Sequence, residues 1–194
     1  VHAASNGELQ SAKPVLDALA ARYSQTSLLI TCNSLSGRLW AEELGYHAVL
    51  SPLDLRWAQR RFMSAYPIAA HVTFEAELWP NRIAILAAAG IPIAALGARM
   101  SARGQNLWRR FPRLSAKLLN ALAYLQPQDA DSDQRFKSLG IDARKMGPVL
   151  NWKSLYQPQT IDLDSTRRCN ICLAASTHPG EDEIILKAFG LVRQ

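Results

Sequence analysis

The sequence predicts an α/β protein built on a Rossmann-like parallel sheet with helices on both faces. Short apolar segments alternate with amphipathic segments over residues 1–151. Glycine, proline, asparagine and serine mark the turns between these segments. Polar motifs follow several of the apolar segments, at the carboxyl ends of the predicted strands. In open parallel sheets, ligands bind beyond those ends.

The predicted elements follow this alternation from the first residue onward. Each strand is a short apolar run, and each helix places its apolar residues at helical spacing. Strands are expected at residues 1–4, 27–32, 47–50, 68–74, 91–96, 123–126 and 143–149. Helices are expected at residues 8–23, 37–44, 55–65, 80–89, 105–122 and 129–139.

Turn residues and prolines refine these boundaries. Residues 5–7, Ser-Asn-Gly, are expected to form a turn before the first helix. Pro14 lies inside that helix and should either kink it or mark a later start. Pro80, in contrast, lies in the first turn of its helix, where proline is well tolerated.

The alternation stops at residue 152, which indicates a second domain. Residues 152–168 contain Gln-Pro-Gln and Asp-Leu-Asp segments and are assigned to a linker. Residues 171–175 then predict a strand, and residues 181–189 predict a helix. One strand and one helix cannot form a sheet alone, so residues 169–194 are interpreted as the start of a truncated second domain. The sequence begins without methionine inside a predicted strand, so we also expect a segment upstream.

The charge balance favours an anionic partner. Lysine and arginine number 22 against 16 aspartate and glutamate, a net charge of +6. This excess suits phosphate, nucleic acid or an acidic membrane surface without choosing among them. Arginines accompany Trp57 and Trp108 on amphipathic helices. That pattern favours an anionic membrane surface, and no nucleic-acid partner is expected.

Cysteines and apolar stretches exclude several other classes. The sequence has three cysteines, Cys32, Cys169 and Cys172. An odd number of cysteines does not predict a disulfide framework. The last two have zinc-like spacing, but no second pair accompanies them, so no metal site is expected. The longest uncharged stretch, residues 83–98, contains Gly90 and Pro92. It is also shorter than the ~20 residues of a spanning helix.

Four polar motifs are candidates for chemistry. Glu8 follows the first strand at a helix start, where the helix dipole favours the ionised carboxylate that a general base requires. The alternative is that Glu8 only satisfies the helix end. The second motif holds Glu75, Glu77 and Asn81, which are suited to sugar hydroxyls. The alternative is that this motif is only the amino end of a helix that carries acidic residues.

The remaining two motifs suit anionic groups. Arg99, Ser101 and Arg103 follow the strand at residues 91–96, where arginine can bind carboxylate or phosphate. A solvated basic turn is the alternative. The last motif, in the second-domain segment, suits an anion at a helix start, with ordinary helix capping as the alternative. Its residues are Ser176, Thr177, His178 and Glu181.

Other common motifs are absent from the sequence. No Gly-x-Gly-x-x-Gly follows the first strand, and there is neither a Walker A loop nor a Gly-x-Ser-x-Gly elbow. His47 and His71 lie on apolar strand segments and are interpreted as core histidines.

Taken in order, the four motifs resemble those of the 3-deoxy-D-manno-octulosonic acid (Kdo) transferases of lipopolysaccharide synthesis. They read His-x-x-Ser-x-Gly-Glu, Glu-x-Glu-Leu-Trp-Pro-Asn, Ala-Arg-x-Ser-x-Arg and Ser-Thr-His-x-Gly-Glu. Residues 31–37, Thr-Cys-Asn-Ser-Leu-Ser-Gly, resemble a further segment of that family. The resemblance extends over residues 1–189.

The resemblance implies a two-domain GT-B glycosyltransferase. Residues 1–151 would be the acceptor-binding domain, which binds lipid A precursor at the cytoplasmic face of the inner membrane. Residues 169–194 would begin the domain that binds the donor, CMP-Kdo, and no cofactor is implied. Glu8 would be the catalytic base. The other implied substrate-binding residues are Ser5, Gly7, Glu75, Glu77, Asn81, Arg99, Ser101, Arg103, Ser176, Thr177, His178 and Glu181.

Two positions depart from the family pattern. Asn6 replaces a small apolar residue, and Leu150 occupies the position where a lysine is expected. Lys153 is a nearby substitute for that lysine. The alternative interpretation is a divergent, non-catalytic paralogue that binds an anionic glycolipid. Leu150 favours that alternative, whereas Glu8 argues against it.

Overall fold

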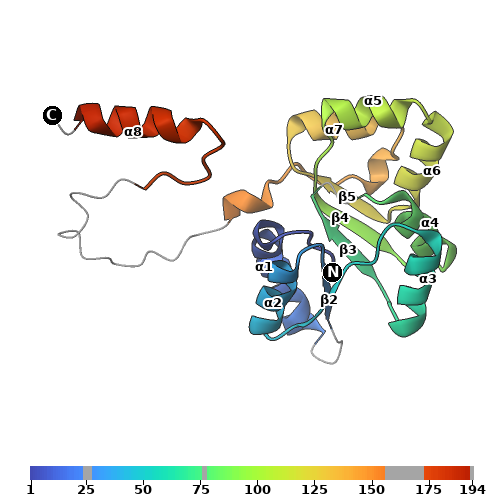
Figure 1. Ribbon diagram of the computed structural model, residues 1–194. Helices are drawn as coiled ribbons and strands as arrows, with labels where there is room; N and C mark the ends of the chain where they lie inside the picture. The colour runs from blue at the N-terminus through green and yellow to red at the C-terminus, as the bar shows by residue number, and fades with distance from the viewer. Residues whose placement is uncertain (24–27, 76–77, 156–172, 193–194) are drawn as a thin grey trace. The chain divides into compact units, whose positions relative to one another are not determined.

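The computed structural model describes residues 1–23, 28–75, 78–155 and 173–192 (Figure 1). The chain divides into two compact units, Val1–Gln157 and Pro158–Gln194. The two units are described separately below.

The first unit alternates strands and helices, as the sequence predicts. Its strands are β1 (Leu29–Cys32), β2 (His47–Leu50), β3 (His71–Phe74), β4 (Ile93–Ala98) and β5 (Tyr124–Pro127). Its helices are α1 (Asn6–Arg22), α2 (Leu35–Glu43), α3 (Arg56–Ala65), α4 (Pro80–Ala88), α5 (Ala102–Arg109), α6 (Pro112–Ala121) and α7 (Ala130–Ser138). Two short 3-10 helices follow, η1 (Ala143–Lys145) and η2 (Trp152–Leu155).

The pairing is parallel throughout these strands. β1 pairs with β2, and β4 pairs with both β3 and β5. Residues 1–4 join the two groups, because His2 forms parallel bridges to Thr31 of β1 and Thr73 of β3. The predicted first strand is therefore reduced to a bridging segment. Counted with that segment, the order across the sheet is β2, β1, residues 1–4, β3, β4, β5, which is the doubly wound Rossmann order.

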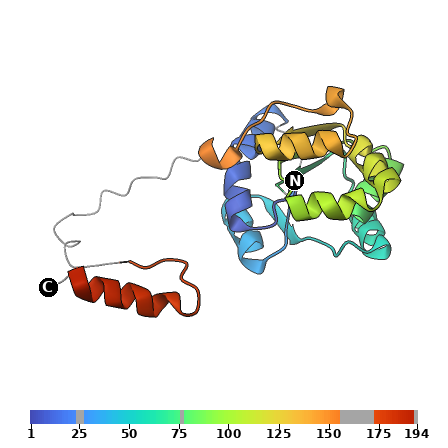
Figure 2. The same ribbon diagram turned by 90° about the horizontal axis from the view of Figure 1, so that it is seen from above.

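Helices cover both faces of this sheet (Figure 2). One buried cluster joins Leu9 and Leu16 of α1 to Ile30 and Phe74 of the sheet. The other joins the sheet to α4 and α6 through residues such as Leu86 and Leu119. Within a strand, every second residue enters the same cluster, as Ile30 and Cys32 do in one and Ile93 and Ala95 in the other, which is the period of a strand. The prediction of an α/β fold with a parallel sheet and helices on both faces is confirmed.

The start of α1 differs from the sequence prediction. The helix begins at Asn6, and the Ser5 hydroxyl accepts a hydrogen bond from the backbone N–H of Glu8 at 3.3 Å. Gly7 therefore lies in the first turn of the helix rather than in a preceding turn. A serine at the N-cap offers the oxygen that unpaired helical N–H groups require, which explains the early start. The helix also continues through Pro14.

Two later elements were also predicted wrongly. The helix expected at residues 105–122 is divided into α5 and α6, because Pro112 starts a new helix and restricts Phe111 to a non-helical conformation. The strand expected at residues 143–149 is absent. Residues 143–145 form η1, and one bridge from Met146 to Leu125 remains. Pro148 has no N–H to continue that pairing.

The second unit contains one described helix, α8 (Glu181–Val192). Residues 173–175 have no regular structure, so the strand predicted at 171–175 is not found in its described part. Residues 171–172 lie outside the described residues, as do Cys169 and Cys172. At the first unit's end, Trp152–Leu155 was assigned to the linker but forms η2 and packs against α1.

Candidate active site at the carboxyl edge of the sheet

The strand order creates a switch point between residues 1–4 and β3. From residues 1–4 the chain continues to one side, through β1 and β2, and then returns to the other side at β3. In doubly wound sheets, the crevice at this point lies between connections that leave in opposite directions. Glu8 follows residues 1–4, and Glu75 follows β3. The two carboxylates therefore come from the two segments that border the switch point.

Glu8 is held by the residues that start α1. Its Oε2 atom accepts a hydrogen bond from the backbone N–H of Ala4 at 2.8 Å, and the side chain is half-buried. This contact resembles a capping box, in which an acidic residue in the first turn satisfies a preceding N–H. Capping and proton transfer are compatible, because a carboxylate has two oxygens.

Glu75 has an unusual backbone conformation. Its φ angle is +54°, in the left-handed region that side chains other than glycine rarely adopt. Its N–H donates to Leu96 at 3.0 Å, and its carbonyl accepts from the N–H of Arg99 at 3.3 Å. Such backbone strain is concentrated at functional sites. The geometry thus favours a functional position for Glu75, and Glu77 lies outside the described residues.

A cation from the end of the first unit reaches Glu75. The Nζ atom of Lys153 lies 2.7 Å from Oε1 of Glu75, whose side chain is 17% exposed. Lys153 lies on η2, which packs against α1. This ion pair places positive charge beside the carboxylate of Glu75, although Leu150 occupies the expected lysine position.

Asn81 contacts the protein itself rather than an open surface. Its Nδ2 atom donates to the backbone carbonyl of Asp54 at 2.7 Å. The carboxylate of Asp54 accepts from the backbone N–H groups of Asn81 and Arg82 at 3.0 and 2.8 Å. Asp54 therefore caps α4, a function that the sequence analysis missed. The two partners are 27 residues apart, so helical spacing could not reveal them.

The arginine motif borders a separate open hollow of about 580 Å³. Arg99 is exposed and lines it, together with Ser101, whose hydroxyl caps α5 by accepting from Gly104 at 3.0 Å. Asp129, which also lines the hollow, caps α7. Arg103 is exposed but is not part of the lining. Arg99 and the amino ends of two helices favour an anionic group in this hollow, whereas the carboxylates of Asp129 and Asp131, which also line it, oppose one.

The last motif lies in the second unit. The N–H of His178 donates to Oε2 of Glu181 at 2.9 Å, and Ser176 has a φ angle of +58°. Thr177 lies between them in the turn before α8. These four residues therefore form one turn at a helix start, as the sequence predicts.

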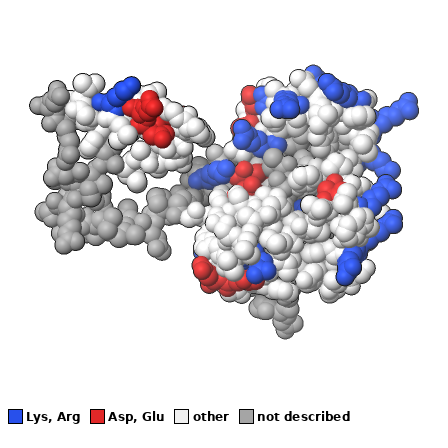
Figure 3. Space-filling view, viewed as in Figure 1, with Lys and Arg blue, Asp and Glu red and all other residues white. Residues whose placement is uncertain are grey.

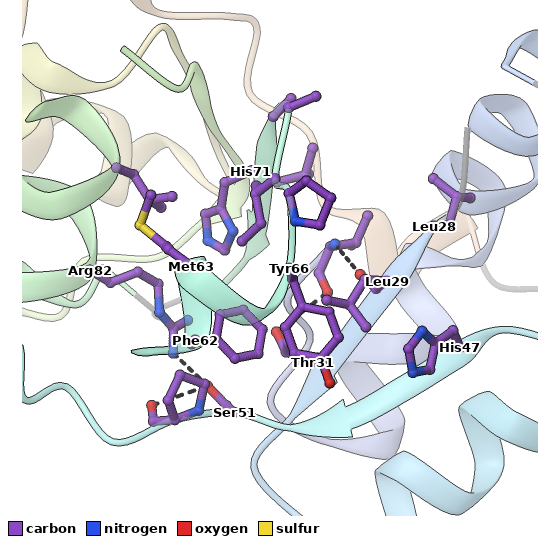
Figure 4. Close-up of a pocket in the computed structure, with 18 of the residues that line it drawn as sticks. Leu28, Leu29, Thr31, His47, Ser51, Phe62, Met63, Tyr66, His71 and Arg82 are labelled. Carbon is purple, nitrogen blue, oxygen red and sulfur yellow. Dashed lines mark hydrogen bonds between the residues drawn. The ribbon is translucent and has the colours of Figure 1, made fainter. Parts of the chain in front are cut away.

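A second cavity, of about 510 Å³, lies on the α3 and α4 side of the sheet (Figure 4). Its lining is mainly apolar, with Phe62, Met63 and Tyr66 among the residues that face it. His71 also lines it, and its buried Nε2 atom has no hydrogen-bond partner within the part of the chain that the structure describes. His47 is exposed, so its assignment to the core was wrong.

The environment of His71 disfavours its charged form. Burial lowers the pKa of His71 well below the usual value, and the positive charge of Arg82 lowers it further. The guanidinium of Arg82 is itself buried and donates to the Ser51 hydroxyl at 2.5 Å. His71 is therefore a neutral histidine at physiological pH.

Basic residues gather on the edge of the first unit that α3 and α6 form (Figure 3). Arg56, Arg60 and Arg61 are exposed on α3, beside Trp57, which is 67% exposed. At the break between α5 and α6, Phe111 is 59% exposed among further arginines. The sequence has no aspartate or glutamate from residue 78 to residue 128.

Neither a membrane span nor a metal cluster was found in the described ranges. No helix there has the length and apolar character that crossing a bilayer requires. Histidine, cysteine, aspartate and glutamate side chains do not gather in groups of three or more that could hold a metal ion, again among the described residues.

Comparison with known proteins connects this geometry to a family. The family model for 3-deoxy-D-manno-octulosonic-acid transferase (kdotransferase) matches residues 1–155. The chain is 33% identical to the 3-deoxy-D-manno-octulosonic acid transferase of Haemophilus influenzae, over 97% of this chain and 47% of the relative. It is 30% identical to the enzyme of the same name from Bordetella pertussis, over 100% of this chain and 47% of the relative.

More distant matches agree with these. A probable mitochondrial 3-deoxy-D-manno-octulosonic acid transferase of Arabidopsis thaliana is 28% identical, over 95% of this chain and 45% of the relative. The UDP-GlcNAc 2-epimerase of Methanocaldococcus jannaschii matches in structure with a TM-score of 0.52 and 14% identity. That likeness covers 77% of this chain and 44% of the epimerase, and it shows the fold alone. The chain spans about half the length of the curated relatives, and it belongs to the 3-deoxy-D-manno-octulosonic acid transferase family.

Proposed function

We propose that the full-length protein transfers Kdo from CMP-Kdo to a lipid A precursor, with Glu8 as the general base. The carboxylate of Glu8 takes the proton of the acceptor hydroxyl as its oxygen bonds to the anomeric carbon of Kdo. The bond between that carbon and the CMP phosphate breaks, and CMP leaves with the electron pair. No cofactor other than the donor nucleotide takes part.

The position of Glu8 carries this proposal. It lies at the switch point of a doubly wound sheet, at a helix amino end that favours the ionised carboxylate. Its contact with Ala4 fixes the side chain. A general base must be ionised and held in a fixed position. The helix amino end favours the ionised form of Glu8, and the hydrogen bond from Ala4 supports the second requirement.

The acceptor is proposed to bind at the carboxyl edge of the first unit. Glu75 and Lys153 provide a carboxylate and an ammonium there, which suit sugar hydroxyls and phosphate. Arg99 and Ser101 provide a second place for an anionic group.

The basic edge supports a location at the inner membrane, on its cytoplasmic face. Arginines and exposed aromatic side chains, with no acidic residue between positions 78 and 128, suit an anionic lipid surface. Binding to anionic vesicles, but not to single-stranded DNA, tests this preference against a nucleic-acid partner. Loss of binding as salt rises is expected in either case and does not distinguish them.

The donor is proposed to require a second domain. Ser176, Thr177, His178 and Glu181 form a turn at the start of α8, where backbone N–H groups and hydroxyls suit the anionic donor. Because the chain spans about half the length of its relatives, we propose that residues 1–194 alone do not catalyse transfer.

A non-catalytic paralogue is the second candidate, and Leu150 is the observation that favours it. The ion pair between Lys153 and Glu75 weakens this objection, because a lysine reaches the crevice from a nearby position. The two candidates differ in one assay. Full-length protein that converts CMP-Kdo and a tetra-acylated lipid A precursor to CMP and a heavier glycolipid is a transferase. Folded protein that binds the lipid without transfer is the paralogue.

A further inference from the structure

A buried glutamine organises the segment that carries Lys153. Gln126, at 2% exposure, lies in β5, and its Oε1 atom accepts two hydrogen bonds. One comes from the backbone N–H of Gly97 at 2.8 Å, and the other from Nε1 of Trp152 at 2.6 Å. Its Nε2 atom donates to the carbonyls of Pro127, Pro148 (3.1 Å) and Leu150 (2.9 Å). One side chain thus joins β4, β5 and the segment that leads to η2.

Trp152 converts this hydrogen bonding into a fixed position for η2. Its ring packs edge-to-face on Phe74, with 6.2 Å between the centroids. It also lies so close to Gly97 that a Cβ atom there would approach Cδ1 of the indole to 3.0 Å. Gly97 has a φ angle of +57° at an irregularity in the pairing of β4. The bulge, the glycine and the indole therefore fit one another.

The next residue, Lys153, reaches Glu75, which directly follows Phe74. Its Nζ atom lies 2.7 Å from Oε1 of Glu75, although the lysine side chain is 53% exposed. Exposed lysines are usually mobile, and an isolated surface pair holds them weakly. Here the preceding residue, Trp152, fixes the backbone of Lys153. Because Trp152 is held by Gln126, the approach of Lys153 to Glu75 depends on that glutamine.

We propose that Gln126 is a positioning residue, which acts through Trp152 to hold Lys153 against Glu75 at the switch point. This inference rests on the proposed function, because the ion pair matters there as part of the acceptor site. The backbone of Leu150 is tied to β5 by its N–H to Pro127 at 3.0 Å and by its carbonyl to Gln126. With leucine at this position, the cation that reaches Glu75 comes from Lys153, three residues later.

Glutamine is the residue that this position requires. Oε1 faces two N–H donors, and Nε2 faces carbonyl oxygens, so both ends of the amide are used. Glutamate would place a second acceptor against those carbonyls, and methionine would remove the donor that the carbonyls of Pro148 and Leu150 share.

A double-mutant cycle in the full-length protein tests the positioning directly. Gln126→Met and Lys153→Met should each lower kcat/KM for the lipid acceptor, on the order of tenfold. The kcat/KM of the double variant should be no lower than that of the less active single variant. Both substitutions remove the same group, the ammonium of Lys153 held beside Glu75. Losses that multiply in the double variant would overturn the proposal.

A matched control separates positioning from a general loss of stability. Gln59 is also buried, at 4% exposure, and its Nε2 donates to two backbone carbonyls, those of Pro52 and Leu53. Gln59→Met removes comparable hydrogen bonds without touching η2. Its effect on kcat/KM should multiply with that of Lys153→Met, and its melting temperature should fall as in Gln126→Met.

A chemical measurement tests the positioning without any transferase assay. The rate of acetylation of Lys153 by acetic anhydride, followed by peptide mass spectrometry, should rise severalfold in Gln126→Met, as in Glu75→Gln, but not in Gln59→Met. An unchanged rate in Gln126→Met would overturn the inference. If the wild type transfers no Kdo, the proposed function fails, and the acetylation rates still decide whether Gln126 positions Lys153.

Discussion

The backbone N–H of Ala4 donates to Oε2 of Glu8 at 2.8 Å, so the proposed base also caps its own helix. The two functions are separable by substitution. Glu8→Gln keeps a side-chain oxygen that can accept from Ala4, but it removes the basic carboxylate. Glu8→Ala removes both.

The first prediction follows from this separation. Glu8→Ala should lower the free energy of unfolding by about 1 kcal/mol, because the Ala4 N–H loses its partner. Glu8→Gln should stay close to the wild type. Chemical denaturation of both variants measures the difference. Equal destabilisation of the two variants would show that the charge of Glu8, rather than its hydrogen bond, stabilises the start of α1.

The second prediction concerns the strained backbone of Glu75. At a φ angle of +54°, glycine should be favoured over alanine by about 1 kcal/mol. We expect Glu75→Gly to unfold at a higher denaturant concentration than Glu75→Ala, while both lose the ion pair with Lys153 and transferase activity. The same midpoint for the two variants would contradict a left-handed conformation at this position.

The third prediction is a pH dependence of stability through His71. Because burial lowers its pKa in the folded state, the unfolded chain binds more protons below its ordinary pKa of about 6.5. Stability should therefore be unaffected by His71 above that pH and should fall progressively below it.

Substitution isolates the contribution of His71. His71→Leu should flatten the loss of stability below pH 6.5, measured by urea unfolding across a pH series. His47→Gln serves as the control, since His47 is an exposed histidine on β2, and it should leave the profile unchanged. An identical profile in His71→Leu and the wild type would contradict a neutral, buried His71.

The fourth prediction concerns the basic edge. Replacing Arg56, Arg60 and Arg61 together with glutamine should weaken partition onto anionic vesicles on the order of a hundredfold, at about 1 kcal/mol per arginine. Arg144→Gln is the control, because that exposed arginine pairs with Asp142. Co-sedimentation with anionic vesicles at low salt measures the partition of both variants. Equal losses of partition in the two variants would show that α3 does not contact the membrane.

Much of the fold could be predicted because its signals are local. Apolar runs identified the positions of the β-strands from β1 to β5, and the placement of Glu8 after the first apolar run was correct. The split at Pro112 was missed, since the apolar spacing continues on both sides of the proline. The strand expected at residues 143–149 is reduced to one bridge. Its apolar residues favour a strand, but Pro148 has no N–H with which to continue the pairing.

The candidate site was predicted less completely, because its contacts are long-range. Asp54 and Asn81 meet across 27 residues, and Gln126 and Trp152 meet across 26. No periodic pattern encodes such pairs. The left-handed conformation of Glu75 was also hidden, since glycine is the usual signal for it and the sequence has a glutamate there.

The most direct test of the central claim is the turnover of full-length Glu8→Gln beside the wild type and Glu43→Gln, an exposed glutamate of α2. CMP release and the mass of the glycolipid are followed with CMP-Kdo and lipid A precursor, after equal folding has been established by thermal unfolding. A general base predicts a fall in kcat of roughly a hundredfold or more for Glu8→Gln and no change for Glu43→Gln. Wild-type turnover by folded Glu8→Gln would contradict the assignment of Glu8 as the base.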